Sequence, residues 1–248
     1  MSKKASVNII SALAAIFLAF SYIGIGFAVC SGSPEPTRII ANVTIDDSSS
    51  PFAKEQLVAG AVATQDYSFN TNNLDAYMTV ISEMNEQART PYEQYNKDQI
   101  QGAPEQFTIT PEQISHLDDV NEVANRFFYP ILAVAVMAAF LLMAGYRYVG
   151  TDVPAKALLW SGIGTLALIA ILVIWALASF DSLFAVFHSL FFVEGTWTFS
   201  ADSLLITMLP EGFWIGIGGL WIGITALLSI IAIIVALVAK KRLQTSDA

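Results

Sequence analysis

The sequence predicts an all-α, polytopic membrane protein with four transmembrane helices and a helical extracytoplasmic cap. Of its 248 residues, 55% are hydrophobic and only 13% are charged, whereas about a quarter of the residues in soluble domains are charged. The mean hydropathy is +0.58. Four apolar stretches reach the roughly 20 residues that a helix needs to cross the hydrocarbon core. They are Val7–Val29, Phe127–Val149, Ala155–Ser179 and Phe213–Ala239.

The first stretch follows Lys3 and Lys4, as the core of a secretory signal peptide would. It is longer than the usual signal core of about 7–15 apolar residues, so we expect residues 1–29 to be retained as the first transmembrane helix. Cys30 is the only cysteine. An internal disulfide is therefore excluded, and packing or the membrane must hold the outer region together.

Basic residues predict the orientation of the four spans. Seven of the twelve basic residues would flank one side of the membrane: Lys3, Lys4, Arg147, Lys156, Lys240, Lys241 and Arg242. Positive charge marks the cytoplasmic side, so we expect both termini to be cytoplasmic. Residues 30–126 then form an extracytoplasmic helical segment. Residues 127–248 form a three-helix membrane region with an extracytoplasmic, histidine-containing loop at 180–212.

The segment 30–126 begins with turn-forming residues at Ser31–Pro36 and Asp46–Pro51. From Phe52 onward the apolar residues recur at spacings of three and four, which predicts amphipathic helices. Two interpretations fit this pattern. The helices could form a small cap packed against the membrane, or a lid over a site.

A helix start is predicted at Thr110-Pro111-Glu112-Gln113, with Thr110 as the capping residue and Pro111 in the first helical position. The helix would carry His116. Asp119 follows three residues later, on the same helix face. An aspartate beside an imidazole can fix the tautomer of the ring and favour its charged form.

The stretch Phe180–Phe192 is apolar at nearly every position but too short to span the bilayer. We expect an interfacial or partly inserted helix. Asp181 and His188 are about two turns apart and share a face of that helix. Trp197, shortly after it, is suited to the headgroup level.

The fourth span begins with aromatic residues and is rich in glycine over its first three turns. Small residues allow helix backbones to approach closely in membranes. We therefore expect a neighbouring helix to pack against Gly216, Gly218, Gly219 and Gly223.

The chain has only two histidines, His116 and His188, and both would face the outer compartment. Each could be a solvated or packed structural residue, or an acid–base group. A metal site with Asp119 or Asp181 is conceivable, but no spacing such as HxxxH supports it, so we expect neither a metal nor another cofactor. A GxSxG motif and a phosphate-binding glycine loop are missing from the sequence. An exterior this acidic would repel nucleic acid.

Two elements resemble motifs of a known family. His116-Leu117-Asp118-Asp119-Val120 resembles an H-[LM]-x-D-V element. Phe187-His188-Ser189-Leu190-Phe191-Phe192, followed by Trp197, Leu204, Pro210 and Trp214, resembles its second element. Together they are similar to the DUF1461 family of integral membrane proteins, over Pro111–Trp214. The four spans and the 72-residue separation of the histidines fit as well.

This resemblance implies a membrane acyltransferase in the bacterial cell (cytoplasmic) membrane, with its active face extracytoplasmic. It would move the sn-2 acyl chain of a lipoprotein's diacylglyceryl-cysteine to the N-terminal amine of the same cysteine, giving a lyso-form lipoprotein. Its partners would be the diacylated lipoprotein N-terminus and membrane lipid.

Acyl transfer to an amine needs a base, an oxyanion partner and a proton for the leaving alkoxide. We expect His116, oriented by Asp119, to be the base, and His188, with Asp181 as its orienting residue, to be the acid or oxyanion partner. A covalent acyl-imidazole is an alternative. Aromatic side chains near His188 would hold acyl chains and exclude water. They are Phe184, Phe187, Phe191, Phe192 and Trp197.

The sequence also departs from the family. The segment between Cys30 and Pro111 is longer and more acidic than the resemblance leads us to expect. The chain could be a paralogue with a changed substrate. A second class also stays open, a non-catalytic membrane protein whose outer cap binds a partner and whose histidines are structural.

Overall fold

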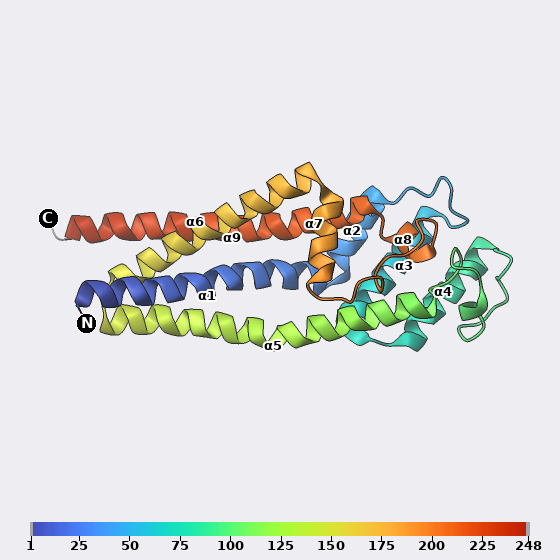
Figure 1. The fold of residues 1–248 in the computed structure, drawn as a ribbon, viewed down its shortest axis with the longest axis horizontal. Coiled ribbons are helices and arrows are strands. Elements are labelled where there is room, and N and C mark those ends of the chain that lie inside the picture. The colour runs from blue at the N-terminus through green and yellow to red at the C-terminus, as the bar shows by residue number, and fades with distance from the viewer. Residues whose placement is uncertain (1, 247–248) are drawn as a thin grey trace. The chain divides into compact units, whose positions relative to one another are not determined.

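A computed structural model describes residues 2–246, so Met1, Asp247 and Ala248, which belong to the predicted terminal segments, lie outside the described residues. Residues 2–246 form helices and connecting turns and contain no β-strand (Figure 1). The elements are α1 (Lys3–Ser31), α2 (Pro34–Thr44), α3 (Lys54–Asp66), the π-helix η1 (Tyr67–Thr71), α4 (Leu74–Ala88), the 3-10 helix η2 (Ile100–Gly102), α5 (Pro111–Tyr148), α6 (Asp152–Ala178), α7 (Phe180–Ser189), α8 (Leu204–Met208) and α9 (Glu211–Ser246).

The chain divides into two compact units. Unit 1 consists of residues 1–28, 127–184 and 220–248, and unit 2 consists of residues 29–126 and 185–219. Unit 1 holds most of α1, the second part of α5, α6 and most of α9. These four helices are long and apolar enough to cross a membrane. The prediction of an all-α membrane protein with four spanning helices is thereby confirmed.

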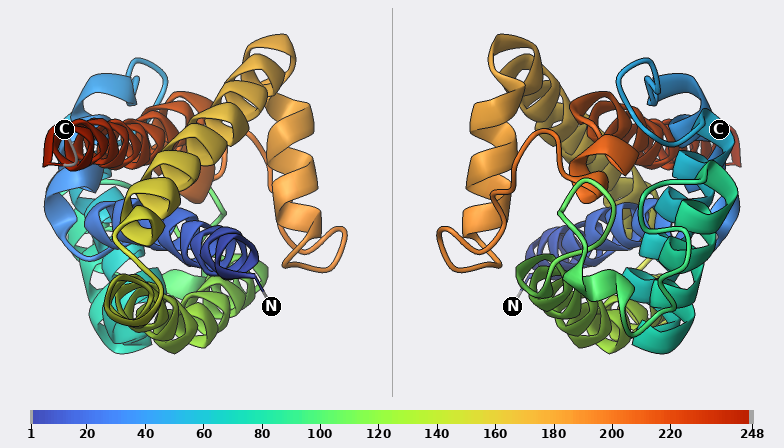
Figure 2. Two further views of the ribbon diagram at one scale, coloured as in Figure 1. Left: turned by 90° about the vertical axis from the view of Figure 1, so that its left-hand side faces the viewer. Right: turned by 90° about the vertical axis from the view of Figure 1, so that its right-hand side faces the viewer.

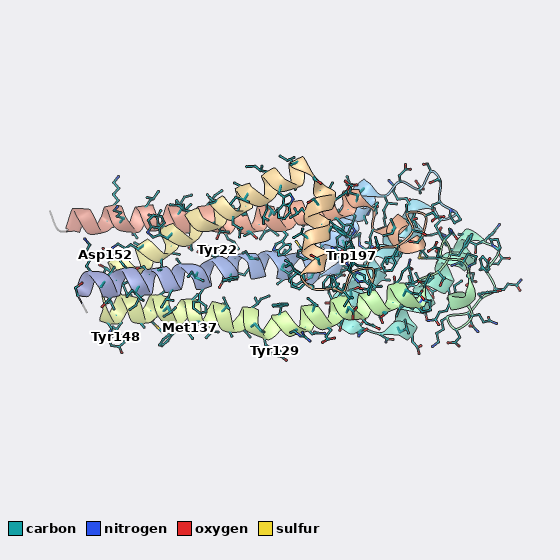
Figure 3. The ribbon with its side chains drawn as sticks, viewed as in Figure 1. Tyr22, Tyr129, Met137, Tyr148, Asp152 and Trp197 are labelled. Atoms are coloured by element: carbon teal, nitrogen blue, oxygen red, sulfur yellow. The ribbon has the colours of Figure 1, made fainter. Side chains whose placement is uncertain are left out.

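Small and polar side chains hold the helices of unit 1 together. The hydroxyls of Tyr22 on α1 and Ser161 on α6 lie 3.1 Å apart; Tyr22 is labelled in Figure 3. A Cβ atom on Gly162 of α6 would come within 2.5 Å of the Ser229 carbonyl oxygen on α9. Close backbone approach of this kind is typical of helix packing in membranes.

Most of the glycines in α9 do not pack against a neighbouring helix, contrary to the prediction. Gly218, Gly219 and Gly223 have open space where a Cβ would lie. Only Gly216 is covered, by the side chain of Ile40. The expected close packing of a neighbouring helix is therefore absent at Gly218, Gly219 and Gly223, and in unit 1 it occurs at other positions, such as Gly26 of α1 against Trp221 of α9.

The start of α1 and the end of α9 lie at the same end of unit 1 (Figure 1). Exposed basic side chains mark these ends and the turn between α5 and α6, namely Lys4, Arg147, Lys240, Lys241 and Arg242. After α6, Ser179 adopts an extended conformation, and the chain turns sharply into α7 (Figure 2).

Unit 2 contains the helical cap, and one hydrophobic core holds it together. Its fully buried large side chains come from both outer segments and include Phe52, Leu57, Ile81, Ile100, Ile109, Leu204 and Met208. The Leu204 N–H also donates a hydrogen bond of 2.8 Å to the Glu105 carbonyl. The two outer segments, distant in sequence, therefore fold as one body.

The predicted start of α5 is confirmed in detail. Pro111 is its first residue. The Gln113 N–H donates to Thr110 Oγ1 at 3.4 Å, and the Thr110 N–H donates to Gln113 Oε1 at 3.0 Å. This reciprocal capping box fixes the first turn of the helix that carries His116.

Candidate active site

The two histidines of the chain come together in unit 2. His116 lies in the second turn of α5 and His188 in the last turn of α7. Their ring centroids are 6.1 Å apart and the rings are inclined by 30°. Each residue is 8% exposed. Two segments that are remote in sequence thus form one buried imidazole pair.

Aromatic rings surround the pair. Phe192 packs against both imidazoles, with its centroid 4.9 Å from that of His116 and 5.6 Å from that of His188. Trp197, labelled in Figure 3, lies 4.9 Å from His188, and Phe187 lies 5.7 Å from it. We call His116, His188, Phe187, Phe192, Trp197 and Phe199 the histidine cluster.

Three predicted contact residues, Phe187, Phe192 and Trp197, therefore belong to the histidine cluster. Phe191 packs on Phe187 and Phe192, at centroid distances of 5.2 Å and 6.3 Å. Phe184 belongs to unit 1, where its ring packs on Phe180 at 5.8 Å.

Sequence reasoning missed Phe199, whose ring centroid lies 5.8 Å from that of His116. It stands in the irregular chain before α8. No periodic pattern there could have indicated that its ring turns inward.

The cluster lies outside the membrane-spanning part of α5. At 38 residues, α5 is much longer than the roughly 20 residues that cross a hydrocarbon core. Its first 16 residues, Pro111–Arg126, carry several charged side chains, including Asp118 and Asp119, that are incompatible with the bilayer interior. The spanning part therefore begins near Phe127, and His116 precedes it by three helical turns.

Burial controls the protonation of His116. Desolvation, and to a lesser extent the nearby His188 imidazole, lowers the pKa of His116 to about 4 from its ordinary value of 6.5. The ring is therefore neutral at physiological pH. Its Nδ1 atom is buried and has no hydrogen-bond partner among the described residues. A neutral imidazole with a vacant nitrogen can accept or transfer a proton.

The two predicted orienting carboxylates are exposed. Asp119 and Asp181 both reach solvent, and among residues 2–246 no hydrogen bond or ion pair joins Asp119 to His116. Asp181 lies in the first turn of α7 and belongs to unit 1. The structure thus gives Asp119 no contact through which it could orient the ring.

Asp118, rather than Asp119, makes the notable carboxylate contact. It accepts a hydrogen bond of 2.5 Å from the hydroxyl of Tyr67, which is buried in η1. The Tyr67 ring also stacks on Tyr77, with centroids 5.1 Å apart. This bond anchors η1 to α5 two residues beyond His116. Short π-helices are frequent at functional sites, but the sequence of η1 carries no signal that predicts one.

No group of three or more His, Cys, Asp or Glu side chains that could hold a metal ion occurs within the described part of the chain. The arrangement instead offers two buried imidazoles that aromatic rings contact. Fold and site together define a helical membrane protein with a buried histidine pair in its cap.

Comparison with known proteins shows which family the chain belongs to. Residues 54–214, more than half of the chain, match the family model described as lipoprotein intramolecular transacylase Lit. The chain therefore belongs to the Lit family. The matched range contains both histidines.

The curated proteins contain a distant relative, an uncharacterized protein of Aquifex aeolicus (strain VF5). It is 27% identical over 125 residues, which are 49% of this chain and 52% of that protein. The matched part of the chain spans about half the length of this relative.

Solved structures show the same fold. The in meso structure of the membrane integral lipoprotein intramolecular transacylase Lit from Bacillus cereus aligns with a TM-score of 0.65 and 15% identity, covering 96% of this chain and 98% of that one. A variant of that protein with one histidine replaced by alanine aligns with a TM-score of 0.66 and 16% identity, covering 96% of each chain. These likenesses show the fold of a membrane-integral protein, in agreement with the four apolar helices of this chain. The family match supports a Lit-like, transacylase-type protein and does not favour a purely structural role.

Proposed function

We propose that this protein is a membrane O-to-N acyltransferase. It transfers the sn-2 acyl chain of a lipoprotein's diacylglyceryl-cysteine to the N-terminal amine of the same cysteine and so produces the lyso-form lipoprotein. The observation that carries the proposal is the buried pair of His116 and His188 within aromatic walls, 6.1 Å apart. Membership in the Lit family supports the reaction class.

In the proposed reaction, the amine nitrogen attacks the carbonyl carbon of the sn-2 ester. A C–N bond forms, the bond between that carbon and the sn-2 oxygen breaks, and a proton passes in net terms from the amine to the sn-2 oxygen. Nucleophile and leaving group belong to one molecule, so the protein has to hold the molecule in a reactive geometry and carry the proton.

His116 is the proposed proton acceptor. Its Nδ1 atom is buried without a partner among the described residues, so the substrate amine can supply that partner. With a pKa of about 4, the ring is too weak a base to deprotonate a free ammonium group, whose pKa is about 7.7–8.0. The amine therefore enters uncharged, and His116 takes its proton only after the C–N bond has begun to form.

The same low pKa favours the second half of the reaction. An imidazolium on His116 is strongly acidic and returns its proton readily. His188 is the proposed partner that protonates the leaving oxygen or hydrogen-bonds the oxyanion, because its ring lies beside that of His116. We assign no orienting role to Asp119 or Asp181, since both are exposed.

The aromatic residues have a separate proposed role. Phe187, Phe191, Phe192 and Trp197 would hold the acyl chains and exclude the water that would otherwise hydrolyse the ester. Phe187 and Phe191 are 44% and 38% exposed. They are therefore accessible to a ligand, whereas Phe192 is half-buried within the histidine cluster.

We further propose that the protein lies in the bacterial cytoplasmic membrane with both termini in the cytoplasm and the histidine cluster on the outer side. The exposed basic residues at the ends of α1 and α9 support this orientation through the positive-inside rule. Diacylated lipoproteins carry their lipid at that outer surface, where the cluster would meet them.

The test is to express the gene in a bacterium that makes diacylated lipoproteins but no lyso-form, and to analyse lipoprotein N-termini by mass spectrometry. We expect N-acyl, monoacylglyceryl-cysteine to accumulate. His116→Ala and His188→Ala should each abolish it. The neighbouring exposed serines provide matched controls, Ser115→Ala and Ser189→Ala, which should retain it. Equal lyso-form levels in the histidine variants and their controls would eliminate the proposed chemistry.

A further inference from the structure

Unit 2 contains a buried carboxamide that the proposed reaction does not yet use. Gln113 lies on α5 three residues before His116, and it is 1% exposed. Its Nε2 atom has no hydrogen-bond partner among residues 2–246. A buried donor without a partner is destabilising, and the large majority of buried polar side-chain atoms have one. An exception one helical turn from a candidate catalytic histidine therefore suggests a role in binding.

The helix cap fixes the orientation of the Gln113 carboxamide. The Thr110 N–H donates to Gln113 Oε1 at 3.0 Å. Only the oxygen of a carboxamide can accept such a bond, because the amide nitrogen is a donor. Oε1 is therefore held at the start of α5. Nε2, with its two N–H groups, is the end of the side chain that is left for another acceptor.

The Gln113 donor and the His116 acceptor lie on one face of α5. Residues three apart on a helix are neighbours, with about 5–6 Å between their Cβ atoms. Side chains also tilt towards the N-terminus of their helix, so the His116 ring leans over the turn that carries Gln113. Gln113 Nε2 and His116 Nδ1 are both buried and both lack a partner in the described part of the chain. An unsatisfied donor and an unsatisfied acceptor thus stand one helical turn apart.

Such a pair matches the tetrahedral intermediate of the proposed reaction. When the amine attacks the sn-2 ester, the carbonyl carbon gains a C–N bond and its carbonyl oxygen becomes an oxyanion. The nitrogen that loses a proton and the oxyanion are bonded to the same carbon atom. The acceptor for that proton and the donor to the oxyanion must therefore lie close together. His116 Nδ1 is the proposed acceptor, and a donor beside it completes the requirement.

The place of Gln113 in α5 also favours an oxyanion. α5 begins at Pro111, so Gln113 belongs to its first turn. The N-terminal end of a helix carries partial positive charge, which stabilises an anion near the first turn. In contrast to an imidazole, a carboxamide does not titrate. Nε2 therefore remains a donor while His116 gains and loses its proton.

We propose that Gln113 is a further catalytic residue, whose Nε2 donates a hydrogen bond to the carbonyl oxygen of the sn-2 ester and stabilises the oxyanion. This proposal rests on the proposed acyl transfer and deepens it. The electron pair of the oxyanion re-forms the C=O bond as the bond to the sn-2 oxygen breaks. The amine proton still passes in net terms to the sn-2 oxygen. His188 then serves the leaving oxygen rather than the oxyanion.

The test measures the conversion of a synthetic diacylated lipopeptide by purified protein in detergent, with two substitutions of Gln113. Gln113→Glu keeps an oxygen that can accept from the Thr110 N–H, as in the usual capping box, but an ionised carboxyl has no donor. Gln113→Met has a similar length and neither group. Thr110→Ala is the matched control, because it removes the hydroxyl that accepts from the Gln113 N–H and leaves Nε2 in place.

Above about pH 8, where the substrate amine is mostly uncharged, Gln113→Met and Gln113→Glu should both lower kcat by about 10²- to 10³-fold, as the loss of one oxyanion donor does. Thr110→Ala should lower the midpoint of a thermal unfolding scan, because it weakens the helix cap. Its kcat should equal that of the wild type.

The pH dependence distinguishes an oxyanion donor from a structural amide. The ratio of variant kcat to wild-type kcat removes the titration of the substrate amine, which all the proteins share. For Gln113→Glu, this ratio should rise as the pH falls, because the introduced carboxyl becomes protonated and its O–H can donate to the oxyanion. For Gln113→Met, the ratio should stay low at every pH.

The outcomes separate the donor role of Gln113 from the proposed acyl transfer. If wild-type protein does not convert the lipopeptide, the acyl transfer fails and the donor role with it. If the wild type is active, His116→Ala is inactive and Gln113→Met keeps the wild-type kcat, the donor role alone is overturned. Equal losses of kcat in Thr110→Ala and Gln113→Met would also overturn it, since the loss would then belong to the helix cap. Should Gln113→Met fail to fold, a Gln113→Glu ratio near one between about pH 6 and 9 would overturn the donor role.

Discussion

Because the chain contains only two histidines, the protonation of His116 can be measured directly. Protein labelled with ¹³C and ¹⁵N on histidine, and purified through a tag without histidine, gives two imidazole signals in an NMR titration. The variant His188→Gln assigns them. We expect His116 to titrate near pH 4, because burial first and His188 second lower its pKa.

The lowered pKa of His116 changes the fraction of the imidazole that is neutral at a given pH. At pH 5.5 an imidazole with a pKa of 6.5 is about 9% neutral, whereas one with a pKa of about 4 is about 97% neutral, a difference of roughly tenfold. His116 should therefore remain a competent proton acceptor at a pH where an ordinary histidine is almost fully charged.

Two variants distinguish burial from the neighbouring His188 as the cause of the lowered pKa of His116. Because burial is the larger cause, Phe192→Ala, which removes the ring 4.9 Å from His116, should raise the pKa of His116 more than His188→Gln does. Both values should remain between about 4 and 6.5. A wild-type pKa near 6.5 would refute the inference that His116 is a desolvated, neutral base. A larger rise in His188→Gln than in Phe192→Ala would refute burial as the main cause.

Two further predictions concern stability. Gly162→Val places side-chain atoms against the Ser229 carbonyl oxygen and should cost about 1–3 kcal/mol, seen as a lower midpoint in a thermal unfolding scan in detergent; Gly164→Val, where the space is open, should leave the midpoint unchanged, and equal midpoints would contradict the packing of α6 on α9. Tyr67→Phe removes the hydrogen bond to Asp118 and should cost about 1 kcal/mol, measured in the same scan. If Asp118→Ala lowers the midpoint equally and the double variant no further, the loss belongs to that bond, whereas additive losses would show that the two residues act independently.

The sequence predicts the spans and the common side of the histidines for a clear physical reason. A helix in lipid must be apolar over its whole crossing length, so length and hydropathy suffice to find it. With four spans, the order of the chain then places the segments that carry His116 and His188 on one side of the membrane. Their convergence required a packing contact between these segments, which the shared core around Leu204 provides.

The role expected of Asp119 shows where helical spacing stops being informative. Residues three apart on a helix differ by about 60° in direction. At the edge of a buried face, this difference is enough to place His116 inside and Asp119 in solvent. Likewise, the contacts of Phe199 and Tyr67 depend on which distant segments pack together, and local patterns do not carry that information.

The two histidines belong to segments between which the chain crosses the bilayer twice, once in α5 and once in α6. During synthesis, His116 emerges long before His188. The pair can form only after that membrane hairpin has been inserted and the second outer segment has closed against the first through Leu204 and Glu105. A chain in which this hairpin has not been inserted therefore cannot assemble the histidine pair.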